Sequence, residues 1–142
     1  MKKSQKILLI IIIVTIAAIW GQSLLNRTAS SAESGFVLAI VGPAFRLIVK
    51  PEHLTMLLIR KLAHFTEFFV LGIELELFLK KKFLWAAGTG FFVAFMDETL
   101  QMFSGREAMI SDVWLDFFGC ITAIAVVILL LRLTRKKKND QN

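Results

Sequence analysis

The sequence has a single cysteine in 142 residues. One thiol, that of Cys120, cannot form an intrachain disulfide, and a zinc site built from four cysteines is excluded. No nucleophile signature surrounds Cys120, Ser104 or Ser111, so no short motif indicates covalent catalysis. The chain also lacks internal repeats. These absences exclude a disulfide framework and a repeat architecture, but they do not reveal the redox compartment.

Charge is also missing from long stretches. Ile7–Asn26 contains twenty residues without a charge, enough to cross about 30 Å of hydrocarbon. Phe83–Met96 and Phe117–Leu131 are further uncharged runs, which reach spanning length only with their polar neighbours. Hydrophobic residues make up 56% of the chain. The composition therefore favours a bilayer over a soluble core.

We predict one domain over residues 1–142, an all-α integral membrane protein that forms a four-transmembrane-helix bundle. The predicted transmembrane helices cover about 7–25, 57–79, 83–103 and 112–131, and a basic cytoplasmic tail covers 132–142. Residues 36–49 are apolar but short and broken by Gly42–Pro43, which predicts an interfacial or re-entrant segment between the first two helices. The first run exceeds a usual signal core and no A-x-A site follows promptly, so a retained anchor is favoured over a cleaved signal.

Basic residues gather where four spans would place them on one side of the membrane. The chain has 17 Lys and Arg against 11 Asp and Glu. Most of the basic residues fall in three clusters: Lys2, Lys3 and Lys6; Lys80–Lys82; and Arg132, Arg135 and Lys136–Lys138. The positive-inside rule then predicts that both termini are cytoplasmic. Nucleic-acid binding is not needed to explain the net charge of +6.

Polar residues continue the packing faces of three predicted helices. Small residues every four positions allow close helix approach in a membrane. The segment 83–103 carries Ala86, Gly90 and Ala94, and the same face continues to Asp97 and Gln101. The same spacing of three or four residues marks one face of each of two other predicted helices. In 57–79 this face carries Arg60, His64, Glu67, Leu71 and Glu74, and in 112–131 it carries Asp112, Asp116, Gly119 and Ala123. The predicted topology brings these polar turns together at the external end of the bundle.

This shared end is the predicted binding site. Its candidate ligand-binding residues are Lys61, His64, Glu67, Asp97, Glu98, Gln101, Arg106, Asp112 and Asp116. The catalytic candidates, if the site is an enzyme, are His64, Glu67 and Asp97. Acids outnumber firm cations, which leaves room for a proton, a bound cation or a cationic ligand. Carboxylates are suitable metal ligands, but no recognised metal spacing is present, so no metal site is predicted.

Two of these groups keep alternative roles. His64 and Glu67 are three residues apart, which fits an acid–base pair, a metal-binding pair, or a hydrogen-bonded pair that joins helices. Arg106 fits bidentate binding of a phosphate or carboxylate, or neutralisation of Asp97 or Asp112. Glu74 and Glu76 are expected to pair with, or reach toward, Lys80–Lys82.

The segments KLAHFTEFFVLG, DETLQMFSGR and SDVWLDFFG resemble the VanZ-like family, which is named for a protein associated with teicoplanin resistance. The resemblance extends from Lys61 to about Ala123. It covers Lys61, His64, Phe65, Glu67, Asp97, Glu98, Gln101, Gly105, Arg106, Asp112 and Gly119. The sequence departs from the family at Asp116, where asparagine is common, and at Ser104, where proline is frequent. The resemblance implies an envelope-facing membrane protein.

Three functions are compatible with this site. The first is a cell-envelope protein that binds a lipid headgroup, glycolipid precursor or glycopeptide and affects susceptibility to teicoplanin-type antibiotics. The second is a membrane enzyme acting on a lipid-linked phosphate or ester. The third is a small proton-coupled lipid transporter. In each case the expected partners are membrane lipids, the protein is a multi-pass protein of the cell membrane, and the polar site faces the exterior. The sequence identifies no cofactor.

Overall fold

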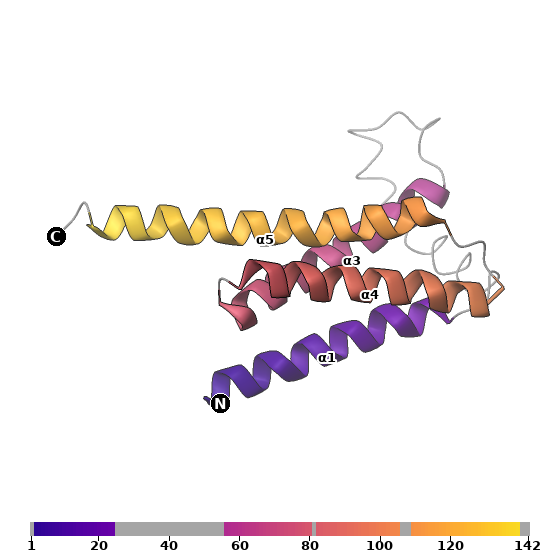
Figure 1. Ribbon diagram of the computed structural model, residues 1–142, viewed down its shortest axis with the longest axis horizontal. Helices are drawn as coiled ribbons and strands as arrows, with labels where there is room; N and C mark the ends of the chain where they lie inside the picture. The colour runs from indigo at the N-terminus through magenta and orange to yellow at the C-terminus, as the bar shows by residue number, and fades with distance from the viewer. Residues whose placement is uncertain (1, 25–55, 81, 106–108, 140–142) are drawn as a thin grey trace.

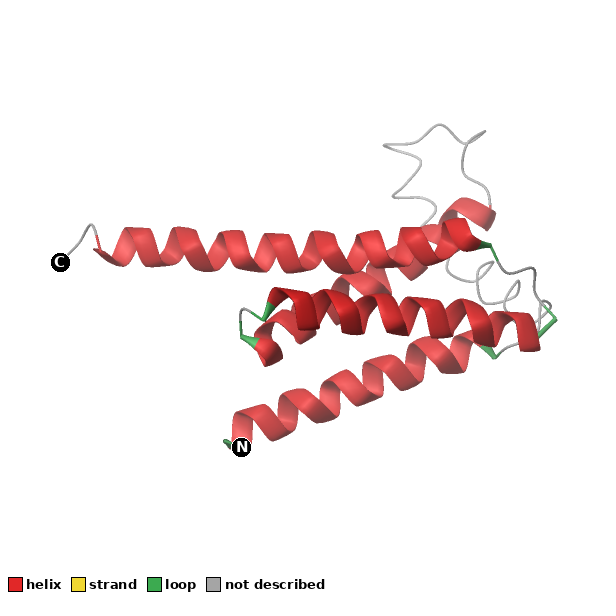
Figure 2. Cartoon of the chain, viewed as in Figure 1, coloured by secondary structure: helices red, strands yellow, loops and turns green. Residues whose placement is uncertain are grey.

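The computed structural model describes residues 2–24, 56–80, 82–105 and 109–139, and within them the chain forms four helices and no strand. The helices are α1 (Lys3–Ser23), α3 (Met56–Leu79), α4 (Phe83–Phe103) and α5 (Ile110–Asn139) (Figures 1 and 2). The all-helical prediction is confirmed for these residues. The interfacial segment predicted over 36–49 lies outside the described residues, as does Arg106.

Helices that follow one another in the described chain run in opposite directions, so α1 is roughly parallel to α4 and α3 to α5 (Figure 1). α5 packs against α3 and α4, while α1 lies against α3 and α4. We call the end where α1 and α4 finish and α3 and α5 begin the polar end. The opposite end, where Lys3, Lys80, Lys82 and the last turns of α5 lie, is the basic end. The polar end therefore combines segments that are far apart in the sequence.

The helix ends differ from the sequence prediction at both termini. α1 begins at Lys3 rather than about residue 7, and α5 continues to Asn139 rather than stopping at Leu131. Both extensions contain strong helix formers and neither Gly nor Pro, so nothing in them terminates a helix. α4 does stop as predicted, at Phe103, because Gly105 follows with a φ of 75°, a left-handed conformation that glycine adopts without strain.

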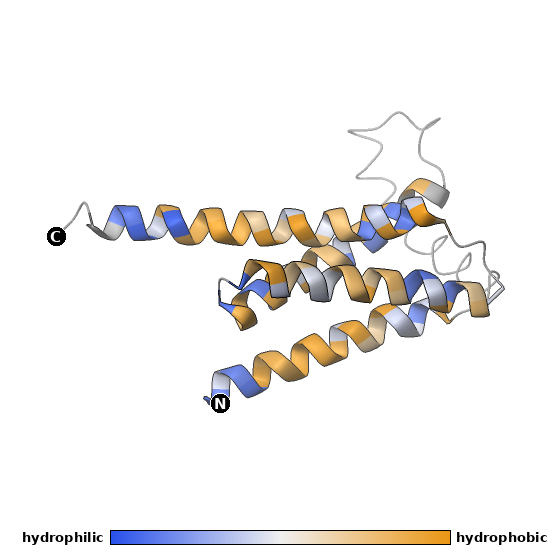
Figure 3. Cartoon of the chain, viewed as in Figure 1, coloured by the Kyte–Doolittle hydropathy of each residue, from blue (hydrophilic) through white to orange (hydrophobic). Residues whose placement is uncertain are grey.

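Two of the helices are long and apolar enough to cross a membrane, namely α1 and residues 110–137 of α5. α3 and α4 fall short by the same measure, because acidic side chains interrupt their apolar stretches. Figure 3 shows hydrophobic central portions in the helices and hydrophilic turns toward their ends. By length and composition alone, α1 and this part of α5 could cross a membrane, whereas α3 and α4 do not meet the same measure.

The bundle is held by apolar side chains and by close backbone contacts at glycines. Phe68, Leu71, Val93 and Ile124 are buried in its core. A Cβ atom placed on Gly119 of α5 would stand 2.5 Å from the carbonyl oxygen of Phe65 in α3, so the two backbones touch at this level. Because a side chain cannot fit there, this contact sets how near α5 comes to α3 beside His64.

The faces predicted from small-residue spacing are buried as expected. In α4, Ala86, Gly90, Ala94, Asp97 and Gln101 are all buried. In α5 the buried positions include Asp116, Gly119 and Ala123, while Asp112 is half-buried. The spacing of small residues therefore identified which sides of α4 and α5 face the bundle.

Candidate functional site

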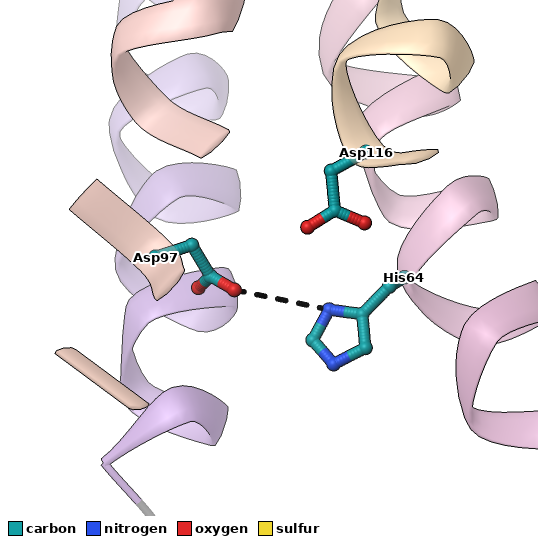
Figure 4. Close-up of side chains that lie close together, drawn as sticks. All are labelled: His64, Asp97 and Asp116. Atoms are coloured by element: carbon teal, nitrogen blue, oxygen red, sulfur yellow. Dashed lines mark ion pairs between the residues drawn. The ribbon is translucent and has the colours of Figure 1, made fainter. Parts of the chain in front are cut away.

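The polar end brings together one histidine and two aspartates from three different helices. His64 comes from α3, Asp97 from α4 and Asp116 from α5, and their side chains point toward one another (Figure 4). One ligand atom from each residue lies within 4.8 Å of the others. We call these three residues the His–Asp–Asp cluster. None of them is near the others in sequence, so the cluster exists only because the helices pack at this angle and register.

Asp97 is the most tightly held member of the cluster. Its side chain is fully buried. One oxygen, Oδ1, accepts a hydrogen bond from the Ser23 hydroxyl of α1 at 2.6 Å. The other, Oδ2, accepts one from the Gln101 side-chain amide at 2.9 Å and lies 3.9 Å from Nδ1 of His64. The carboxylate is thus fixed on both sides and directed toward the histidine.

Asp116 is buried to a similar degree but has fewer partners. Only 2% of the residue is exposed. Its Oδ1 atom is fully buried and has no hydrogen-bond partner among the residues that the structure describes. A buried carboxylate without a partner is costly, because the protein replaces the water that would otherwise solvate it. Asp116 is therefore the group in the cluster whose charge is least compensated.

Glu67 lies one turn further along α3 and borders the cluster. Its Oε2 atom is 4.0 Å from Nδ1 of His64. About a quarter of the Glu67 side chain is exposed, against none of that of Asp97. Two carboxylates therefore lie near the same ring nitrogen of His64, an arrangement that suits proton transfer or ligation of a cation.

A rim of cations borders the acidic interior. Nζ of Lys61 lies 2.7 Å from Oδ1 of Asp112, and both side chains are partly exposed. Arg60 donates a hydrogen bond from Nη2 to the Gln101 Oε1 atom at 3.5 Å. Gln101 thus connects the rim to Asp97, since its amide donates to the carboxylate and its oxygen accepts from the guanidinium. Glu98 is buried and accepts a hydrogen bond from the backbone N–H of Met109.

The predicted site residues thus divide into three groups. His64, Asp97 and Asp116 form the cluster, with Glu67 and Gln101 in contact with it. Lys61, Asp112 and Glu98 lie around it. Arg106 is outside the described residues. The described part of the predicted site is brought to one end of the bundle, although Lys61 and Asp112 are occupied with each other.

Sequence reasoning missed the contribution of α1. Ser23 is fully buried and bonds to Asp97, and Thr15 donates to Oε1 of Glu74 at 3.0 Å. The sequence signal that could have indicated this contribution is the presence of Thr15 and Ser23 in an otherwise apolar run. Trp20, which donates from Nε1 to the Val93 carbonyl oxygen, belongs to the same face of α1. One side of α1 therefore binds polar groups of α3 and α4.

The glutamates near the basic end have neighbours on other helices as well as in the lysine turn. Glu74 accepts the Thr15 hydrogen bond, and Glu76 is almost fully buried. Glu76 lines a cavity of about 390 Å³ with Arg132 and Arg135 of α5. A smaller hollow beside it is lined by Glu76 and Lys80. The glutamates thus face α1 and α5 as well as the lysine turn.

These features define the class of protein: a helical bundle with two strongly apolar helices and a buried polar cluster at one end. The VanZ/LLP1 family model matches residues 6–132, nearly the whole chain, and the chain therefore belongs to the VanZ/LLP1 family. The resemblance stated from the motifs is confirmed. The chain matches no curated protein and no solved structure.

Proposed function

We propose that this VanZ/LLP1 family chain is a four-span membrane protein whose polar end faces the cell exterior. There it binds the phosphate-bearing headgroup of an envelope lipid or glycolipid, without turnover. The observation that carries the proposal is the arrangement of Arg60 and Lys61 at the rim of a buried acidic cluster at one end of the bundle.

Exposed apolar side chains on α3 and α4 support four spans. Large hydrophobic residues are exposed on every helix, including Val70 on α3, Leu84 and Phe92 on α4, and Phe118 on α5. A water-soluble bundle would not leave this much apolar surface uncovered. The exposed threonines Thr66, Thr99 and Thr122 each donate to the carbonyl oxygen four residues earlier, so their hydroxyls need no water. Such a surface suits contact with lipid.

The basic end supports the proposed orientation. Lysines and arginines of α1, α5 and the α3–α4 turn lie together there, opposite the polar end. The positive-inside rule assigns such an end to the cytoplasm, so both termini are cytoplasmic and the polar end faces out. In this position the polar end meets the headgroups of the outer surface of the membrane.

Arg60 is the group best suited to bind an anion from that surface. Within the part of the chain that the structure describes, it makes one hydrogen bond, at the long distance of 3.5 Å. A guanidinium has five N–H donors in a planar fork that matches phosphate oxygens. Lys61 adds charge beside it, and Arg106 stays a predicted further contact. Occupation of a glycolipid headgroup would in turn alter how glycopeptide antibiotics meet the cell surface.

The binding test uses the full chain in nanodiscs and a soluble or lipid-bound phosphate probe. We expect saturable binding of a polyprenyl phosphate, and binding about tenfold weaker for Arg60→Gln, which removes one charge-assisted contact. Arg132→Gln, the same change at the basic end, is the matched control and should bind like the native chain. Equal losses in the two variants, or no saturable binding at all, would contradict a headgroup site at the polar end.

The orientation is tested by cysteine labelling of Ser104→Cys in intact cells, since the native Cys120 is buried. Reaction with a membrane-impermeant maleimide from outside is expected. Labelling only after the cytoplasmic side is opened would reverse the topology and remove the basis for an external headgroup.

A membrane enzyme acting on a lipid-linked phosphate is the second candidate. It is favoured by the position of His64, whose Nδ1 atom lies 3.9 Å from Asp97 and 4.0 Å from Glu67. A histidine flanked by carboxylates can move a proton to a leaving oxygen. The same nanodisc experiment distinguishes the two: release of inorganic phosphate that His64→Gln abolishes shows an enzyme, and binding without product shows a binder.

A further inference from the structure

The His–Asp–Asp cluster has the donor atoms of a metal centre. We propose that His64, Asp97 and Asp116 bind a divalent first-row transition-metal ion, of the zinc or manganese type, in the interior of the bundle. This site is distinct from the headgroup contact at Arg60, and it was not predicted from the sequence because its ligands come from three helices rather than from one spaced motif.

The geometry fits an ion with small side-chain adjustments. Ligand atoms around such an ion stand about 3–4 Å apart, since each bond to the metal is about 2.0–2.2 Å long. The His64 Nδ1 and Asp97 Oδ2 atoms are 3.9 Å apart, and all three ligand atoms lie within 4.8 Å of one another. His64 and Asp97 are thus too far apart for a hydrogen bond but close to the separation that a shared ion would impose.

Asp116 provides an independent reason to place a cation there. It is 98% buried, since 2% is exposed, and its Oδ1 atom has no hydrogen-bond partner among the described residues. Figure 4 shows its carboxylate directed into the space between Asp97 and His64. A metal ion in that space would supply the missing partner and turn an unpartnered buried carboxyl group into a coordinated carboxylate.

The side-chain cations near the cluster do not meet this need. Lys61 lies against Asp112, and Arg60 reaches Gln101 rather than a carboxylate of the cluster. His64 offers a ring nitrogen within 4.8 Å of a carboxylate oxygen of each of the two aspartates. A divalent ion would balance the two aspartates, with Glu67 near enough to His64 to act as a further ligand.

The surroundings also fix the ligands, as they do in established metal centres. Ser23 holds Oδ1 of Asp97 at 2.6 Å, which leaves Oδ2 directed at the histidine. Gln101 donates to Oδ2 at 2.9 Å. Hydrogen bonds of this kind orient the side chains that bind a metal directly, and they raise the affinity of the site for the metal. One imidazole with two or three carboxylates favours zinc, manganese or iron over calcium and magnesium, which prefer oxygen alone.

The test measures metal directly in the purified full chain. The protein is extracted in detergent without chelators, and its metal content is measured by mass spectrometry, with about one ion per chain expected. Protein treated with EDTA is then titrated with Zn²⁺, Mn²⁺ and Mg²⁺ while its unfolding temperature is followed. Zn²⁺ or Mn²⁺ in hundredfold excess over Kd should raise the unfolding temperature by about 5 °C or more.

Two variants on the same helix separate the site from its surroundings. Asp116→Asn should weaken Zn²⁺ or Mn²⁺ binding by about a hundredfold or more. Asp112→Asn, the same change one turn earlier and next to Lys61, should retain the metal. Equal loss in both variants, or a response to Mg²⁺ alone, overturns the proposal. If Asp116→Asn does not fold, the native chain decides: no retained ion and no shift of the unfolding temperature overturns it.

The metal test and the headgroup test fail separately. Metal content and unfolding temperature are measured without any phosphate lipid, and Arg60→Gln leaves the three ligands in place. Loss of lipid binding in a metal-loaded protein therefore contradicts the headgroup site alone.

Discussion

Buried acids lie at two levels of the bundle, and α1 supplies a hydroxyl to each level. Ser23 donates to Asp97 at the polar end, and Thr15 donates to Glu74 about two turns nearer the basic end. The two bonds are alike, but what surrounds them is not. Asp97 has a histidine and a second buried aspartate nearby. Two residues after Glu74, Glu76 instead lines a cavity with the α5 arginines Arg132 and Arg135.

The difference shows how one helix can stabilise acids with different roles. At the Glu74 level each acid has a local partner or lies near basic side chains, which is sufficient for a structural role. At the polar end a hydroxyl and an amide bond to Asp97, whereas Oδ1 of Asp116 has no hydrogen-bond partner in the described chain, as is also true of Oε2 of Glu74. An unsatisfied buried acid next to a histidine is a feature of a site and not of packing alone.

The largest effect on the difference between the two levels is expected from a change that separates α5 from α3 at the polar end. Gly119→Ala would put a Cβ atom 2.5 Å from the carbonyl oxygen of Phe65, so the backbones must move apart. We expect a loss of about 1–3 kcal/mol in unfolding free energy, measured by SDS titration with circular dichroism, and a parallel loss of metal binding.

Gly88→Ala is the matched control, since no atom lies within 4 Å of the new Cβ atom. Alanine favours the helix at such a position by up to about 1 kcal/mol. A stability loss in this variant as large as that of Gly119→Ala would show that the close α3–α5 contact is not the cause.

A smaller effect is expected from removing the α1 hydroxyls one at a time. Ser23→Ala removes a fully buried bond to a carboxylate and should cost about 2 kcal/mol, while Thr15→Val should cost about 1 kcal/mol. Only Ser23→Ala should also weaken metal binding, by about tenfold, because it frees the Asp97 carboxylate to rotate. If both variants weaken metal binding equally, α1 acts through the bundle as a whole and the two levels are not distinct.

The smallest effect is expected at the rim. Lys61→Met breaks the pair with Asp112, whose side chains are 42% and 28% exposed. The loss should be at most about 1 kcal/mol in unfolding free energy and should shrink as salt is added, because exposed pairs are screened. Lys80→Met at the basic end serves as the control with no expected change. A salt-independent loss at Lys61 would mean that the rim is structurally part of the buried cluster.

Much of the fold could be predicted from the sequence, because helices form over local apolar runs and end at residues such as Gly105, whose positive φ terminates α4. The apolar runs and the small-residue spacing predicted four helices and the buried faces of α4 and α5. The extension of α5 to Asn139 was missed, because residues 132–142 were predicted as a tail beyond the last helix, although several of them favour a helix. The predicted number of spans rests on charge placement as well as on hydropathy, and it stays a prediction.

The sequence predicted most residues of the candidate site, but it did not predict which of them contact one another. Spacing within each helix put His64, Asp97 and Asp116 on bundle-facing sides. It could not show that these three meet while Asp112 turns to Lys61, because that choice depends on helix rotation and on the contact between Gly119 and Phe65. Ser23 was missed for the same reason, since its partner lies on α4, 74 positions away.

The sequence by itself determined the family, the helices and the sides of α4 and α5 that face the bundle. These properties follow from residue order within a few turns. Tertiary structure decided which acids share a histidine, which acid is left without a partner, and that α1 completes the site. Those outcomes depend on distances of a few ångströms between helices, which are set by how closely the backbones of α3 and α5 pack at Gly72 and Gly119.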